Sequence, residues 1–113
     1  MPPAITVSDL PYDGNSHDFE GYLHGDTPAS IIFFAGPPGS GPKLHRHPYA
    51  EIFLVHEGTA LFTVGNETFE LLAGQMAICP ANVAHKFVNT GAGTLRQTDI
   101  HLNDRFVTEW LEG

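Results

Sequence analysis

Apolar residues recur along the chain in short blocks that are separated by turn-forming residues. Eight blocks have the length of a β-strand, and Gly, Pro, Asn or Asp stands between most of them. The predicted strands cover residues 19–23, 31–35, 51–55, 60–64, 68–72, 76–79, 85–88 and 95–102. Gly65 and Asn66 separate two alternating segments and predict a two-residue hairpin. Many short strands with tight turns favour an all-β sandwich or barrel.

The end of the chain has a different pattern. Phe106, Val107, Trp110 and Leu111 are spaced as on one face of a helix. We therefore expect a short C-terminal helix that packs on the barrel.

The length and composition agree with this reading. A chain of 113 residues has room for one core, so we expect a single domain over residues 1–113. Glycine contributes 12 residues and proline 9, while only 16% of the residues are charged, a balance typical of proteins made of strands and turns.

The charge excludes two classes of partner. The formal net charge is −8, so the chain offers no basic surface to nucleic acid or to an anionic membrane. The longest uninterrupted apolar run, residues 31–35, is far shorter than the roughly 20 residues of a spanning helix. Cys79 is the only cysteine, which excludes an internal disulfide and fits a reducing compartment. We expect a cytoplasmic protein in which Cys79 is a small buried apolar residue.

Four residues in the middle of the chain have the types and spacing of a metal site. His45 and His47 are two apart, so in an extended segment both imidazoles point to one side. Glu51 opens an apolar strand, where a buried carboxylate is costly unless a cation neutralises it. His85 opens another strand and offers a third imidazole. Such a set suits one divalent transition metal: Mn, Fe, Ni, Co, Cu or Zn.

The spacing of these residues, and of nearby glycines, resembles the two conserved motifs of the cupin superfamily. The first motif spans Gly39 to Gly58 and the second spans Gly74 to Asn89, with the four residues inside them. Asn82 stands where the family usually has glycine. This departure is mild, because Asn tolerates a left-handed backbone better than most residues.

The resemblance implies a double-stranded β-helix, the jelly-roll barrel of the cupins, with a metal held inside it. The matching ligand positions are His45, His47, Glu51 and His85. It also implies a metal-dependent enzyme, either a dioxygenase or a lyase, isomerase or decarboxylase, acting on a small anionic or chelating oxygen substrate. A binding or sensing module without turnover has the same sequence features, as has a barrel in which the metal is only structural. The chain is too short for a two-barrel oxalate decarboxylase, and thiol dioxygenases generally lack the acidic ligand.

Other residues are candidates for the surroundings of the metal. Phe53 and Phe87 are expected to wall a partly apolar substrate pocket. Gln97, Asp99 and His101 share one face of the last strand, and the sequence leaves open whether that face is inside. If it is, His101 and Gln97 are candidates for a base or a substrate-binding group beside the metal.

Two expectations concern the outside of the barrel. His56 is out of phase with the inward residues of its strand and is expected to face away from the metal. Edge strands and an amphipathic tail with Trp110 leave apolar surface to cover, so we expect a homodimer.

Overall fold

Strands make up most of the protein, whose computed structural model describes residues 4–112. The strands are β1 (Tyr12–Asp13), β2 (Ser16–Glu20), β3 (Ser30–Gly36), β4 (His45–Arg46), β5 (Glu51–Glu57), β6 (Thr59–Val64), β7 (Glu67–Leu72), β8 (Met76–Cys79), β9 (His85–Asn89), β10 (Leu95–His101) and β11 (Glu109–Trp110). Two short 3₁₀ turns, η1 (Val7–Asp9) and η2 (Gly21–Leu23), complete the regular structure of these residues. Among them, no helix has the length and apolar character needed to cross a membrane.

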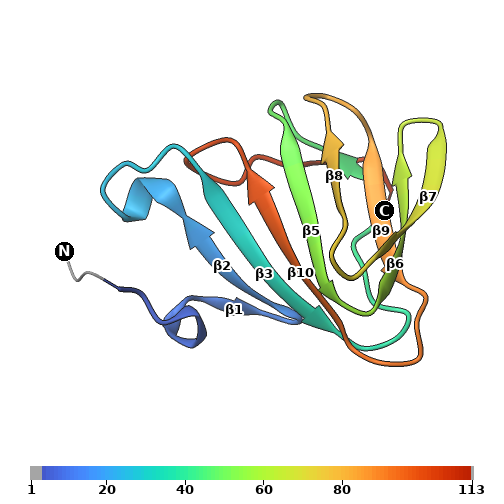
Figure 1. Cartoon of the computed structure of the whole chain (residues 1–113). Coiled ribbons are helices and arrows are strands. Elements are labelled where there is room, and N and C mark those ends of the chain that lie inside the picture. The colour runs from blue at the N-terminus through green and yellow to red at the C-terminus, as the bar shows by residue number, and fades with distance from the viewer. Residues whose placement is uncertain (1–3, 113) are drawn as a thin grey trace.

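The strands form two antiparallel sheets that face each other (Figure 1). One sheet has six strands in the order β1-β2-β3-β10-β5-β8, and the other has five in the order β11-β4-β9-β6-β7. Strands distant in sequence lie side by side, such as β10 between β3 and β5 and β9 between β4 and β6. This is the jelly-roll arrangement, so the predicted all-β fold is confirmed.

The turns follow the predicted chemistry. Val64 pairs with Glu67, and Gly65 at φ 60° begins the two-residue turn between β6 and β7. Asn82 has φ 67°. It therefore takes the left-handed backbone conformation expected at a position where the cupin motif usually has glycine. The first predicted strand is shifted, because β2 ends at Glu20 and residues 21–23 form η2.

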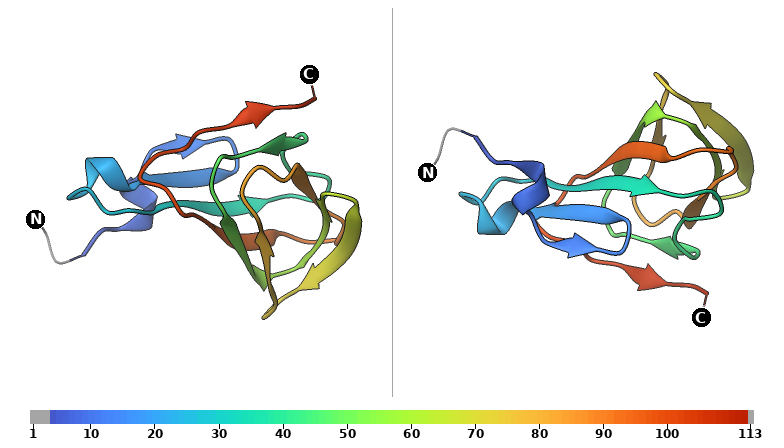
Figure 2. Two further views of the ribbon diagram at one scale, coloured as in Figure 1. Left: turned by 90° about the horizontal axis from the view of Figure 1, so that it is seen from above. Right: turned by 90° about the horizontal axis from the view of Figure 1, so that it is seen from below.

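The predicted C-terminal helix is wrong. Glu109–Trp110 form β11, in which Trp110 pairs with His45 of β4, and the Leu111 amide donates to the Leu44 carbonyl at 2.9 Å. Figure 2 shows β11 running alongside β4 at one side of the molecule. A helix of so few residues is unstable alone, whereas the open edge of β4 offers backbone partners to an extended segment.

The apolar core lies between the sheets and adjoins one row of polar residues. Phe62 is 0% exposed, and its ring centroid is 4.8 Å from that of Phe53 and 5.3 Å from that of Phe87. Successive side chains of a strand point to opposite faces of the sheet. Glu51, two positions before Phe53, therefore points into the barrel as Phe53 does, and it is buried. Strand β5 therefore carries core residues and, at its first position, a buried carboxylate.

Candidate metal centre

The structure brings the four predicted ligands together at one end of the barrel. His45 lies on β4, His47 follows that strand, and Glu51 and His85 are the first residues of β5 and β9. All four side chains are buried, and one ligand atom from each lies within 4.8 Å of the others. The Nε2 atoms of His47 and His85 each stand 3.1 Å from Glu51 Oε1.

These separations fit a shared metal ion. Two ligands bound at about 2.0–2.2 Å to one ion lie roughly 3.0–3.5 Å apart, depending on the angle between them. His47 Nε2 is buried and has no hydrogen-bond partner among the described residues. A buried polar atom without a partner is costly, and an ion would satisfy this one.

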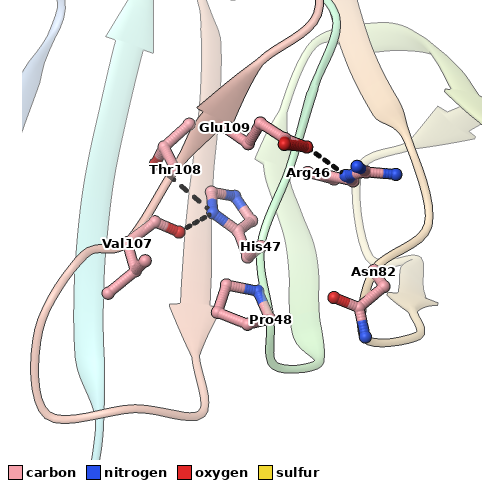
Figure 3. Close-up of a pocket in the computed structure, with 7 residues that line it drawn as sticks. All are labelled: Arg46, His47, Pro48, Asn82, Val107, Thr108 and Glu109. Carbon is pink, nitrogen blue, oxygen red and sulfur yellow. Dashed lines mark hydrogen bonds and ion pairs between the residues drawn. The ribbon is translucent and has the colours of Figure 1, made fainter.

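The three imidazoles are oriented by the same device. Each Nδ1–H donates to a backbone carbonyl: His45 to Lys43 at 2.7 Å, His47 to Val107 at 2.9 Å and His85 to Val83 at 3.1 Å. Figure 3 shows the His47 ring turned toward the Val107 carbonyl. With hydrogen on Nδ1, each imidazole in its neutral form offers the Nε2 lone pair to a metal, which is the arrangement typical of histidines that bind metals.

His101 has the opposite arrangement. The Val107 amide donates to the Tyr49 oxygen at 3.2 Å, and the Tyr49 hydroxyl lies 2.7 Å from His101 Nδ1. His101 Nε2 stands 3.2 Å from Glu51 Oε2, and because a carboxylate favours a hydrogen on the nitrogen that faces it, Nδ1 is left to accept from Tyr49. His101 therefore faces one carboxylate oxygen and leaves the other, Oε1, to the ligand imidazoles.

The polar face of β10, which the sequence left unassigned, is the inner one. Gln97, Asp99 and His101 are all buried, and the Gln97 amide donates to Asp99 Oδ1 at 2.7 Å. Burial raises the pKa of Asp99 well above its usual value, and the negative charge of Glu51 adds to the effect. Asp99 and His101 line the cavity beside the ligands.

The cavity beside the ligands has a volume of about 250 Å³. Phe53 and Phe87, the expected wall residues, both line it. Two further groups of lining residues were not predicted from the sequence: Asp13, Ser16 and Asp18 from β1 and β2, and Phe106, Thr108 and Trp110 from the C-terminal segment. The alternation of Ser16 and Asp18 along β2 was the available signal for the first group.

The electrostatics of the four side chains centre on Glu51 and His85. Burial opposes ionisation of Glu51, but contacts with His101, His47 and His85 outweigh it and hold the carboxyl pKa well below its usual range. Burial also opposes protonation of His85, but contacts with Cys79 and Glu51 outweigh it and raise the imidazole pKa to about 10. His85 is therefore charged at neutral pH until a metal displaces its proton.

His45 is neutral over the same pH range. Burial lowers its pKa to about 4, although the Lys43 carbonyl favours the charged form. One of the ligand imidazoles is thus ready to bind a metal without losing a proton.

His56 faces away from the four candidate ligands as expected, and Cys79 is buried as expected. His56 is exposed, and its Nε2 contacts Thr98 Oγ1 at 2.7 Å on the outer side of the sheet. Cys79 is a buried free thiol, as predicted, and its Sγ lies 3.3 Å from His85 Nδ1.

One family model and several curated proteins match this chain. A family model described as the cupin domain matches residues 32–101. Auxin-binding protein 1 of Arabidopsis thaliana is 33% identical over 107 residues, covering 80% of this chain and 54% of that protein. The transcriptional regulator PuuR of Escherichia coli is 32% identical over 79 residues, covering 68% of this chain and 42% of that protein. The chain thus spans about half the length of the curated relatives it matches.

Among solved structures, oxalate decarboxylase of Bacillus subtilis superposes with a TM-score of 0.81 at 20% identity, over 93% of this chain and 31% of that one. Another structure of that enzyme, from work on its Mn(II) centers, gives a TM-score of 0.79 at 21% identity, over 88% and 29% of the two chains. At such identities the match shows a shared fold. Because the family model covers more than half of the residues, this chain belongs to the cupin family.

Proposed function

We propose that this chain is a metal-dependent cupin that holds one divalent transition metal through His45, His47, Glu51 and His85. We further propose that it is an enzyme acting on a small molecule that binds the metal through oxygen. The observation that supports this most is the convergence of oriented imidazole nitrogens on one carboxylate oxygen beside a cavity.

The donor set limits the chemistry. A divalent ion bound by three neutral imidazoles and a carboxylate supplies a Lewis acid of net charge +1, with up to two positions of an octahedron open. That suits either a dioxygenase acting on an enolate or dihydroxyaromatic, or a lyase, isomerase or decarboxylase. In both, Tyr49 would orient His101 beside Glu51, while Phe53 and Phe87 keep water from one side of the cavity. Mn²⁺ is the first ion to test, because a structurally similar enzyme is described with Mn(II) centers.

Metal analysis of protein purified without chelator tests the site. We expect about one metal ion per chain, and loss of it from a folded His85→Ala variant. The matched control is His56→Ala, which removes an exposed imidazole and should keep the ion. Full metal content in His85→Ala would show that the ligand assignment is wrong. Oxygen uptake and absorbance with dihydroxyaromatics and 1,3-diketones then separate oxidase from Lewis-acid chemistry.

A binding or sensing module without turnover is the second candidate. Two matching relatives are named as a binding protein and as a transcriptional regulator, and the matches cover 80% and 68% of this chain. A metal-loaded protein that binds a screened ligand and leaves it chemically unchanged would favour this candidate.

We also propose that the chain forms a homodimer through the outer face of the six-stranded sheet. Strand register places Ile31, Ile100, Ile52 and Ile78 in one row across β3, β10, β5 and β8. Ile78 is 62% exposed at the sheet edge. Two chains of net charge −8 meet with less repulsion along a row of uncharged side chains.

Sedimentation velocity tests the dimer. We expect a dimer that Ile78→Glu converts to monomer. The control is Leu23→Glu, because Leu23 is about equally exposed but lies outside this row, and this variant should leave the dimer intact. A wild-type monomer at all concentrations would refute the proposal.

A cytoplasmic location is proposed on the cysteine content. Cys79 is the only cysteine and is buried as a free thiol. Proteins without disulfides are common in reducing compartments. Fractionation of the source cells would test this location.

A further inference from the structure

Charged side chains are distributed unevenly around the cavity. Besides Glu51, three carboxylic acids line it: Asp13, Asp18 and Asp99. Among the described residues that line the cavity, none is Lys or Arg. The sheet that faces the ligand imidazoles therefore contributes acidic side chains to the cavity, and no Lys or Arg among the described lining residues pairs with them.

The strand register explains how these acids reach the interior. Asp18 of β2 pairs with Ile32 of β3, Ile32 pairs with Asp99 of β10, and Asp99 pairs with Phe53 of β5. Paired residues in an antiparallel sheet share a face, so this row lies on the inner face with Phe53. Neighbouring strands are about 4.8 Å apart, which places Asp18 and Asp99 on the order of 10 Å from each other. Two carboxyl groups thus stand on either side of Ile32.

The same acids are held in place by short polar contacts. The Ser16 hydroxyl donates to Asp18 Oδ1 at 2.9 Å, and the Gln97 amide donates to Asp99 Oδ1 at 2.7 Å. Each of these hydrogen bonds uses the Oδ1 oxygen of its carboxyl group. Burial raises the pKa of both Asp18 and Asp99, so each takes up a proton more readily than a free carboxyl group. A cationic group beside them would favour their charged forms, whereas a second carboxylate would be a further buried anion without a Lys or Arg to pair with it.

We propose, resting on the metal site of the proposed function, that the cavity selects a small ligand with two unlike ends. One end is an oxygen that binds the metal, and the other is a hydroxyl or ammonium group that donates a hydrogen bond to Asp18 or to Asp99, with the second acid on the other side of Ile32. A dicarboxylate is disfavoured, because its second carboxylate would face these acids with no Lys or Arg beside it. The fold shared with oxalate decarboxylase therefore does not extend to a diacid substrate.

Three probes that differ only at the far end test this selectivity. Succinate, 4-hydroxybutyrate and 4-aminobutyrate share a four-carbon chain and one carboxylate for the metal, and they end in a carboxylate, a hydroxyl and an ammonium group. The protein is first loaded with Mn²⁺ and its metal content is measured, and each probe is then titrated by calorimetry. We expect 4-hydroxybutyrate and 4-aminobutyrate to bind at least tenfold more tightly than succinate.

Variants connect the preference to the acidic side chains of the cavity. Asp18→Asn and Asp99→Asn keep the size of each side chain, and each should reduce the preference for 4-aminobutyrate over succinate about tenfold. Two positions are used because Asp18 is less buried than Asp99 and its variant is the safer one for folding. Asp26→Asn is the control, since Asp26 is exposed, lies outside the cavity and has φ 53°, which Asn tolerates.

The outcomes separate the two proposals. A chain that takes up no metal refutes the proposed function, and this inference with it. A loaded chain that binds succinate as tightly as the other probes, or that binds none of them, overturns the inference and leaves the metal site standing. Unchanged preference in both folded Asp variants also overturns it.

Discussion

Glu51→Gln tests the metal site at the residue on which its other members converge. The side chain is 3% exposed, with Oε1 facing two Nε2 atoms at 3.1 Å and Oε2 facing His101 at 3.2 Å. Gln has nearly the same shape, so the packing is kept while the only anionic ligand is lost. Groups that merely orient a ligand change metal affinity about 10–100-fold. Loss of this ligand is therefore expected to weaken Mn²⁺ binding at least about 100-fold.

Linkage converts this weakening into a thermal shift. A ligand at 1,000 times its dissociation constant stabilises the folded state by about 4.1 kcal/mol, and at 10 times by about 1.4 kcal/mol. At a metal concentration chosen 1,000-fold above the wild-type value, the variant thus loses about 2.7 kcal/mol of stabilisation. For a domain of this size, 1 kcal/mol corresponds to about 4 °C, so the metal-induced rise in Tm should shrink by about 10 °C.

Differential scanning calorimetry with and without Mn²⁺ measures the effect as a difference within each variant. This removes any change that the substitution causes in the metal-free chain. Glu57→Gln is the matched control, because Glu57 ends the same strand, is exposed and pairs with Arg96 at the surface. An equal metal-induced rise in Glu51→Gln and wild type would refute the role of Glu51.

Three other outcomes are expected. Tyr49→Phe removes the hydroxyl that lies 2.7 Å from His101 Nδ1, so the imidazole loses its fixed tautomer. The affinity for Mn²⁺, measured by chelator competition, should fall about 10–100-fold. Unchanged affinity would contradict the positioning role of His101. Because the His85 pKa is about 10 in the metal-free chain, Mn²⁺ must displace its proton below that pH. About one proton should be released per ion at neutral pH, and the apparent affinity for Mn²⁺ should rise about tenfold per pH unit up to pH 10. Calorimetry in two buffers of different ionisation enthalpy counts the released protons. Binding without proton release would contradict the raised pKa of His85. Phe62→Ala empties a core position that is 0% exposed and should lower the free energy of unfolding by about 3–5 kcal/mol in urea, whereas a loss under about 1 kcal/mol would show that the core collapses into the gap.

The strands and the four candidate ligands were predictable because their signals are local. Gly65 begins a tight turn between alternating segments, and the short separation of His45 and His47 places both rings on one side of an extended segment. Even Asn82, which departs from the family pattern, was interpretable from backbone preference alone.

Features that depend on distant partners were not predictable. The tail around Trp110 has helical spacing, but its backbone pairs with β4, more than 60 residues earlier in the chain. On β10, apolar Ile100 faces outward while Asp99 and His101 face inward, the reverse of what burial of apolar residues alone suggests. Only the assembled barrel, with a polar end to its interior, decides between the two faces.

The candidate ligands are divided between the two sheets, since His45 and His85 are register partners in one and Glu51 belongs to the other. An ion held by all three would act as a cross-link between layers whose strands β5 and β9 share no backbone ladder. Removal of the metal with a chelator should therefore speed amide hydrogen exchange on both β5 and β9, with little change in β6 and β7. The metal would then stabilise the contact between the two sheets, in addition to any role in binding or reaction.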